Sequence, residues 1–243
     1  MINPLINIYY NRLFFRTDLL IARGFFLNNL ITDSCDIDNV HELFIKVYLE
    51  YSMVLENSLI KLQNKGVLRS ITRNFYNYIL LDANLFYRLV DTFNTSGLGL
   101  RPITLYDLYC FKEAIIYIGK GKHGRKYYHL KEAIKLFDGN MKIEDINNKY
   151  IKIVDVWKKG GGILVIQVFS DTDNYLALNR EFSMIKSAGP NLTNAINGSV
   201  HGLMKDEWTS NEILNFGEML IYFSLYQCLL ERPIPTYPHD MRK

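Results

Sequence analysis

The stretch Ala114-Ile-Ile-Tyr117-Ile-Gly119-Lys-Gly121-Lys-His-Gly-Arg125 decides how the fold is interpreted, because it passes from an apolar run to a basic segment. A continuous run of aliphatic and aromatic residues such as this one is typical of a buried strand. Gly119 and Gly121 then allow a break in the strand and a close approach of the backbone to a bound group such as a phosphate. We therefore expect a strand that carries Tyr117 to its end.

A helix is expected after this turn, from Gly124 to about Phe137. Arg125 and His129 are four residues apart, which places both on one face of such a helix. Arginine can bind a phosphate through two hydrogen bonds, and histidine can donate to a phosphate oxygen or transfer a proton. A basic helix start with a structural histidine accounts for the same residues.

Positive charge is concentrated in this part of the chain. Residues 119–159 carry a net charge of +6, whereas the whole chain of 243 residues carries +3. Such a stretch is the expected footprint of contacts with a phosphate backbone, although solvated helix faces give the same pattern. The residues that we expect to contact a nucleic acid are Lys120, Lys122, Lys126 and Lys131.

The rest of the chain supplies two more strands and several helices. Apolar runs predict strands at 76–81 and 163–169, and helical periodicity is found at 38–63, 143–158, about 172–188 and 210–231. The longest apolar run, 219–230, is too short to span a bilayer and indicates a buried helix. Three strands among helices predict an α/β (α+β) domain, a small three-stranded sheet flanked by helices, at residues 71–243. Residues 1–70 are expected to form a helical N-terminal extension.

Glu181 is an acidic residue within an apolar helical stripe. Leu178 precedes it by three residues, and Met184 and Ile185 follow at three and four. Burying an unpaired carboxylate is costly, so this residue needs a partner. A divalent cation such as Mg²⁺ or Mn²⁺ would serve, because hard cations favour carboxylate oxygen. The neighbouring Arg180 is the alternative partner.

The order of these residues resembles that of the motifs in the GIY-YIG nuclease superfamily. The finer resemblance is to the eukaryotic branch whose members carry ankyrin repeats and a LEM domain. It covers roughly residues 72–243, and residues 1–70 show neither ankyrin repeats nor a LEM domain. The matching residues are Tyr117 to Lys122, Arg125, His129, Arg180-Glu181, Met184-Ile185, Gly189 and Leu192-Thr193-Asn194.

The first tyrosine of the family motif has two candidates, since the chain contains no Gly-Ile-Tyr sequence. Tyr106 has the spacing of compact family members, but Thr104 to Asp107 looks like a helix cap. Tyr78 lies in a predicted strand and is the preferred candidate. Residues 83–111 are then an insertion before the second motif.

The resemblance implies a metal-dependent endonuclease with one divalent metal, Mg²⁺ or Mn²⁺, held by Glu181. Tyr78 or Tyr117 would orient or deprotonate the attacking water, which requires that a nearby cation such as Lys120, Arg125 or the metal lower the tyrosine pKa from about 10. Arg125 would also clamp the phosphate. His129 would hydrogen-bond a phosphate oxygen or assist proton transfer, and Asn194 would orient backbone or a catalytic group.

Nothing in the sequence resembles a base-reading helix or a zinc finger, so we expect DNA to be selected by shape, as branched or distorted DNA. The alternatives are a non-catalytic nucleic-acid-binding or protein-interaction module and an RNA substrate. Three widely spaced cysteines (Cys35, Cys110 and Cys228) and an N-terminal segment unlike a signal peptide indicate an intracellular protein, in the nucleus or the cytoplasm, with no membrane partner. The sequence does not identify a protein partner for residues 1–70.

Overall fold

The computed structural model describes residues 37–66, 72–94, 103–195 and 203–242, together with Gly198 and Val200. Residues 1–36 and 67–70 of the expected N-terminal extension lie outside the described residues. Within that extension, the helix expected at 38–63 is confirmed as α2 (Ile37–Asn64), and Gly66 follows it with a φ of 73°.

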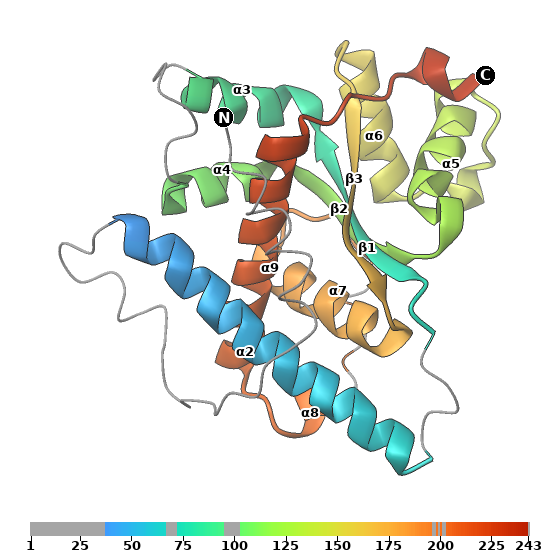
Figure 1. Ribbon diagram of the computed structural model, residues 1–243. Coiled ribbons are helices and arrows are strands. Elements are labelled where there is room, and N and C mark those ends of the chain that lie inside the picture. Colours follow the sequence, from blue (N-terminus) through green and yellow to red (C-terminus); the bar gives the residue numbers. More distant parts are fainter. Residues whose placement is uncertain are drawn as a thin grey trace. The chain divides into compact units, whose positions relative to one another are not determined.

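A three-stranded antiparallel sheet forms the centre of the described region (Figure 1). The central strand β1 (Phe75–Asp82) pairs on one side with β2 (Ile115–Gly121) and on the other with β3 (Ile163–Thr172). The predicted strands are therefore confirmed. The predicted break at 119–121 is wrong, because β2 continues in register until Gly121 pairs with Tyr76.

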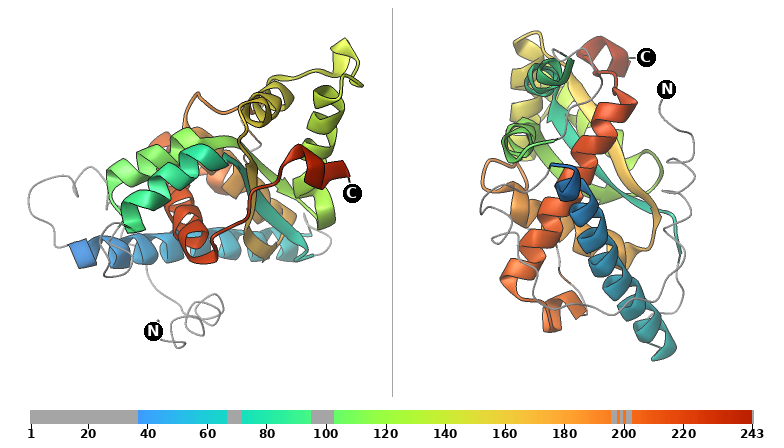
Figure 2. Two further views of the ribbon diagram at one scale, coloured as in Figure 1. Left: turned by 90° about the horizontal axis from the view of Figure 1, so that it is seen from above. Right: turned by 60° about the vertical axis from the view of Figure 1, so that its left-hand side comes forward.

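Helices cover both faces of this sheet. Helices α5 and α6 lie on one face, and α7 and α9 lie on the other (Figures 1 and 2). The α+β architecture predicted from the sequence is confirmed. The helix bounds are Ala83–Asn94 (α3), Leu105–Ala114 (α4), Tyr128–Phe137 (α5), Asn148–Lys158 (α6), Asn174–Ala188 (α7), Leu203–Asp206 (α8) and Ser210–Glu231 (α9), with short 3₁₀ turns at His123–Tyr127 (η2), Ile143–Asp145 (η3) and Pro238–Arg242 (η4).

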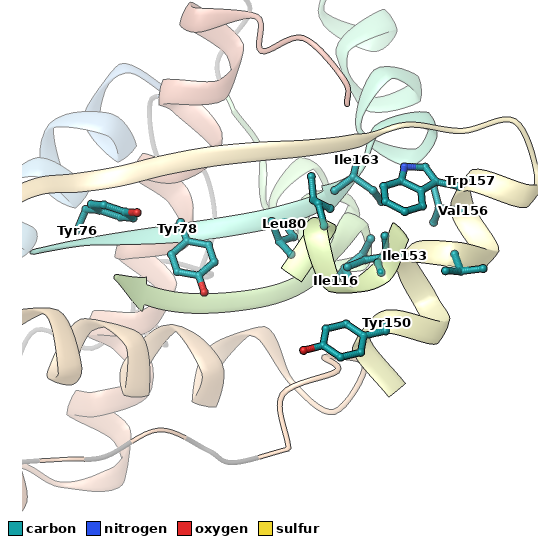
Figure 3. Close-up of a cluster of buried hydrophobic side chains, with 12 residues drawn as sticks. Tyr76, Tyr78, Leu80, Ile116, Tyr150, Ile153, Val156, Trp157 and Ile163 are labelled. Carbon is teal, nitrogen blue, oxygen red and sulfur yellow. The ribbon is translucent and has the colours of Figure 1, made fainter. Parts of the chain in front are cut away.

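The alternation of side chains along β1 divides the core between the two faces. Tyr76, Tyr78 and Leu80 point toward α5 and α6 and belong to a buried cluster with Ile153 and Trp157 (Figure 3). Asn77 points the other way, where its side-chain Nδ2 donates to the backbone carbonyl of Ala177 in α7 at 2.9 Å. Tyr78 is thus directed to the α5 and α6 side of the sheet.

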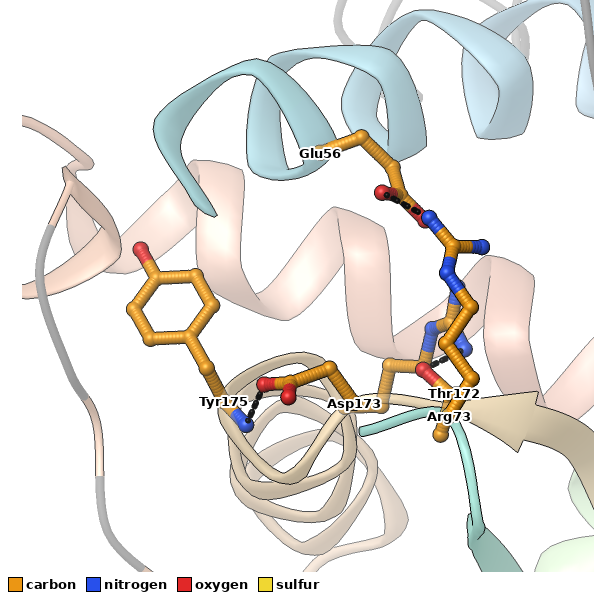
Figure 4. Close-up of polar contacts among 6 residues, drawn as sticks. Glu56, Arg73, Thr172, Asp173 and Tyr175 are labelled. Carbon is orange, nitrogen blue, oxygen red and sulfur yellow. Dashed lines mark hydrogen bonds and ion pairs between the residues drawn. The ribbon is translucent and has the colours of Figure 1, made fainter. Parts of the chain in front are cut away.

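Helix α2 packs on the α7 and α9 side of the sheet. The hydroxyl of Ser58 in α2 lies 2.9 Å from that of Tyr175 in α7. Glu56 of α2 also forms an ion pair with Arg73, just before β1 (Figure 4). The described part of the N-terminal helix is therefore joined to the same core as the sheet.

Two predicted helix starts are wrong, and the local backbone conformation explains one and a capping side chain the other. The segment after Gly124 begins as the 3₁₀ turn η2, entered through His123 with a φ of 49°, and becomes α-helical only at Tyr128. Helix α6 begins after Asn147, whose side chain accepts a hydrogen bond from the backbone N–H of Tyr150. Asparagine caps helix starts in this way and interrupts the pattern that apolar spacing predicts.

Helix α9 is long and apolar enough, by length and composition alone, to cross a membrane. It packs against α7, α2, α4 and β3, and more than half of its apolar window is buried in the fold. It is a core helix, as the sequence predicted. A capping box between Thr209 and Glu212 begins the helix.

Candidate active site

Three ring-bearing side chains from three elements meet at the α5 side of the sheet. The hydroxyl of Tyr78 in β1 lies 2.8 Å from Nε2 of His129 in α5. The ring of Tyr117 in β2 lies with its centroid 4.6 Å from that of His129 and 5.9 Å from that of Tyr78. Tyr78 and His129 are buried, with 1% and 4% of their surface exposed. The structure therefore brings together three of the residues expected at an active site.

Gly119 makes this arrangement possible. It pairs with Tyr78 across the strands, and a Cβ atom at this position would lie 2.6 Å from Cζ of Tyr78 and 2.7 Å from Cε1 of Tyr117. Gly121 leaves similar room for Arg125, because a Cβ atom added at Gly121 would lie 2.7 Å from the Cβ of Arg125. Both motif glycines thus accommodate side chains of the site itself.

Polar residues from α7 and the segment after it complete the outer edge of β2. Asn194 accepts from the backbone N–H of Ile118 at 3.1 Å and donates to its carbonyl at 2.7 Å. Two residues further along the strand, the backbone N–H of Lys120 donates to Oε1 of Glu181 at 3.2 Å. Edge strands present unpaired backbone groups, and these side chains satisfy them. The same hydrogen bonds fix Asn194 and Glu181 relative to Tyr117.

Glu181 lacks the charged partner that its neighbour in sequence was expected to provide. Arg180 instead donates to the hydroxyl of Thr172 at 3.0 Å and lies over the ring of Phe169. Burial raises the pKa of Glu181 to about 6, against the opposing effect of the charge and backbone N–H of Lys120 and the charge of Lys149. The carboxylate is therefore ionised at neutral pH but poorly compensated.

The donor set around Glu181 bears on whether it could hold a metal. Among the described residues there is no group of three or more His, Cys, Asp and Glu side chains able to surround an ion. A single carboxylate with Oε1 bound to one backbone N–H fits Mg²⁺, which commonly keeps several waters and takes one or two carboxylates together with substrate phosphates. It does not fit an ion that needs a cage of protein ligands.

Two cations flank the tyrosines. The guanidinium of Arg125 is exposed and lies 4.4 Å from the centre of the Tyr128 ring. Nζ of Lys149, at the start of α6, lies 3.9 Å from the centre of the Tyr117 ring. Burial, followed by the charge of Arg125, lowers the pKa of Lys149 to about 8. Lys149 was not among the predicted site residues, because it stands in no motif and only the basic composition of the segment pointed to it.

The expected face shared by Arg125 and His129 is not present, because Arg125 lies in the 3₁₀ turn and is exposed while His129 is buried. Burial, with the charges of Lys149 and Arg125, lowers the pKa of His129 to about 3, so its imidazole is neutral at physiological pH. Its Nδ1 has no hydrogen-bond partner among the described residues. The buried imidazole contacts Tyr78 and is not exposed at the surface of the site.

Arg125 lowers the pKa of both tyrosines, as expected of a nearby cation, but in the protein alone the net change in both pKa values is upward. Burial is the largest cause and raises the pKa of both Tyr78 and Tyr117. The hydroxyl of Tyr117 also raises the pKa of Tyr78, and the charge of Glu181 raises the pKa of both phenols. The charge of Arg125 lowers both pKa values without offsetting the effect of burial. Both phenols are therefore protonated at neutral pH unless additional positive charge is brought to the site.

The four lysines expected to contact nucleic acid differ in their surroundings. Lys120 donates from Nζ to Asn174 at 2.6 Å, and Lys126 donates to Gln167 at 2.9 Å. Lys122 and Lys131 are exposed. The two exposed lysines lie in the η2 and α5 region beside the site.

The two candidates for the first motif tyrosine lie in different environments. Tyr78 is buried within the site, whereas Tyr106 is 72% exposed on α4, in the first turn of a helix whose capping box joins Thr104 and Asp107. The stretch expected as an insertion, 83–111, contains α3 and most of α4, and residues 95–102 within it lie outside the described part of the chain.

The three-stranded antiparallel sheet flanked by helices is consistent with a nuclease-type domain of the GIY-YIG class. The model of one family, described as the LEM-3-like GIY-YIG domain, matches residues 75–243. The chain belongs to this family.

Two curated relatives carry the same name. The chain is 30% identical over 176 residues to ankyrin repeat and LEM domain-containing protein 1 of Mus musculus, a match that covers 71% of this chain and 31% of that protein. The Homo sapiens protein of that name is 27% identical over 168 residues, covering 67% and 27%. The chain thus spans less than a third of the length of these relatives. No solved structure gives a significant match.

Proposed function

We propose that the protein is a metal-dependent endonuclease that hydrolyses phosphodiester bonds in branched or distorted DNA. The observation that carries this proposal is the ring cluster of Tyr78, Tyr117 and His129 beside a single under-compensated carboxylate, Glu181. A phenol that additional positive charge can deprotonate, an arginine and a metal-binding carboxylate suit this hydrolysis, because a water must lose a proton while charge builds on the phosphate.

Tyr117 is the residue that we assign to orient and deprotonate the attacking water. Its hydroxyl interacts with that of Tyr78, which lowers the pKa of Tyr117 while raising that of Tyr78. His129 is neutral and can donate from Nε2 to Tyr78, which then donates to Tyr117. This direction of hydrogen bonds stabilises a phenolate on Tyr117. Lys149, against the same ring, adds positive charge.

Glu181 is assigned as the protein ligand of one Mg²⁺ or Mn²⁺. When bound, the ion supplies positive charge to the scissile phosphate and the leaving oxygen. It also offsets the charge of Glu181 that otherwise raises the pKa of Tyr117. Arg125 is assigned to the phosphate, since it is exposed and its planar group can bind two oxygens. Asn194 is a positioning residue through its two bonds to Ile118.

Lys122 and Lys131 are assigned to the DNA backbone, with Lys120 and Lys126 available only if they exchange their present partners for phosphates. Contacts of this kind position a duplex without reading its bases, which is why we propose selection by shape. Location inside the cell, without distinction between nucleus and cytoplasm, stays a prediction.

The test is cleavage of supercoiled plasmid and of a branched DNA in Mg²⁺, Mn²⁺ or EDTA, with wild type, Glu181→Gln and Tyr117→Phe. We expect metal-dependent cleavage that both substitutions reduce by at least about a hundredfold while the variants remain folded. Cleavage that persists in Glu181→Gln would contradict the metal assignment. Metal-independent binding without cleavage by folded wild type would instead favour a non-catalytic binding module.

A further inference from the structure

We propose that Tyr128 is a stacking platform for an unpaired base next to the scissile phosphate, so that the enzyme prefers an unpaired nucleotide beside the cut. This inference rests on the proposed function and names both a specificity-determining residue and the feature that it recognises in branched DNA. It differs from selection by duplex shape, because it places one base in direct contact with the protein.

Tyr128 is one of two exposed tyrosines in this turn, with Tyr127, and it is the one whose ring lies next to His129 and Arg125. Its side chain is 42% exposed, whereas Tyr78 is 1% exposed and Tyr150 is 9% exposed. Its hydroxyl has no hydrogen bond with any described residue. A large ring held partly exposed at the surface of a basic segment is the kind of group on which nucleic-acid bases stack.

The position of the ring ties it to the reaction centre. Tyr128 begins α5, directly before His129, and the two ring centroids are 5.9 Å apart. It lies on the side of the site formed by α5 and α6, since the His129 ring beside it has its centroid 6.4 Å from that of Tyr150 in α6. A base on this ring would belong to a nucleotide adjacent to the phosphate at Tyr117.

Arg125 provides the link between phosphate binding and base stacking. In the free protein its guanidinium lies 4.4 Å from the centre of the Tyr128 ring, in the place that a base would occupy. When Arg125 turns to a phosphate, that face of the ring is released for a base. The two steps are therefore coupled, and a cation–π contact is exchanged for an arginine–phosphate pair and an aromatic stack.

Only an unpaired base can use this platform. In a continuous duplex each base is stacked between its neighbours, and extracting one requires unpairing and unstacking energy. Beside a branch, flap or mismatch the base is already unpaired or partly unstacked, so little of this energy is needed. The stack thus favours cleavage next to a discontinuity over cleavage within a duplex.

The experiment combines binding and cleavage with matched substrates. A flap DNA carries 2-aminopurine, a fluorescent base that is quenched by stacking, or an abasic site at each position next to the branch. Wild type, Tyr128→Ala and Tyr128→Trp are compared with Tyr106→Ala as the control, since Tyr106 is an exposed tyrosine on α4, outside the site. Binding is measured in EDTA, and KM and kcat are measured in Mg²⁺.

We expect wild type and Tyr128→Trp to quench one 2-aminopurine position, and Tyr128→Ala to lose this quench and bind about tenfold more weakly. The loss should fall on KM, and on the abasic substrate wild type and Tyr128→Ala should behave alike. An equal defect on the abasic substrate, or no quench by wild type, would overturn the proposal. Quench without cleavage would refute the proposed nuclease activity and leave the stack, whereas cleavage without quench would do the reverse.

Discussion

At the scale of single residues, the arrangement of the two tyrosines depends on the lack of a side chain at Gly119. Gly119 has no Cβ, and the space is filled by Tyr78 and Tyr117 from either side. We predict that Gly119→Ala lowers the cleavage rate by about a hundredfold or more, because the methyl group must displace both phenols by more than a small adjustment. Gly124→Ala is the matched control, since a Cβ there meets nothing within 4 Å. Comparable activity of the two variants in the plasmid assay, with matching thermal unfolding, would show that the tyrosines tolerate displacement.

Site residues that stand in a recognisable motif or strand could be predicted from the sequence, and the others could not. Tyr117, Glu181 and Asn194 were predicted because their order resembles that of the family motifs, and Tyr78 because it lies in a predicted strand. Lys149 reaches the Tyr117 ring only because α6 begins after Asn147 and turns its first residues toward β2. Sequence spacing contains no information on such a contact between separate elements. The neutral state of His129 likewise comes from burial that only packing reveals.

At the scale of elements, the sequence foresaw the types better than their ends. Apolar runs located all three strands, and the capping boxes at Thr104 and Thr209 located two helix starts. The starts of α5 and α6 were missed, because local hydrogen bonds and a left-handed residue at His123 overrode the apolar spacing. The pairing order of the sheet, with β1 in the middle, follows from long-range contacts and was not predicted.

The packing of α7 against α9 controls where Glu181 lies, because α7 carries this residue to the edge of β2. A Cβ on Gly217 of α9 would lie 2.0 Å from the backbone oxygen of Ser183. We predict that Gly217→Ala lowers the free energy of unfolding by about 3 kcal/mol, since the helices must move apart. In an ordinary helix interior the same change stabilises by about 1 kcal/mol, so the sign is diagnostic. Thermal unfolding beside the exposed Asn211→Ala in the same helix checks this, and an unchanged or higher Tm would contradict the close packing.

At the scale of the whole molecule, the charge at Glu181 opposes folding while serving the proposed metal. A carboxyl with a raised pKa binds its proton more tightly in the folded state, so the folded protein is penalised wherever this group is ionised. The penalty is complete above pH 6, the approximate pKa in the fold, and disappears below the ordinary value of 4.5.

The described N-terminal helix α2 contacts α7 and α9, so the stability of this core also includes residues outside the family match at 75–243.

We therefore predict that Glu181→Gln is more stable than wild type at pH 7.5 in EDTA, by about 2 kcal/mol, because the amide removes the buried charge and keeps an oxygen for the N–H of Lys120. Denaturant unfolding from pH 4 to pH 8 should show the difference shrinking to nothing near pH 4.5. The exposed Glu207→Gln should show no such dependence. Adding Mg²⁺ should stabilise wild type and leave Glu181→Gln unchanged, since only the folded wild type binds the ion. Equal stability of the two proteins at pH 7.5 in EDTA would mean that the carboxylate is compensated by a group other than a metal, and the same Mg²⁺ response in both would place the ion elsewhere.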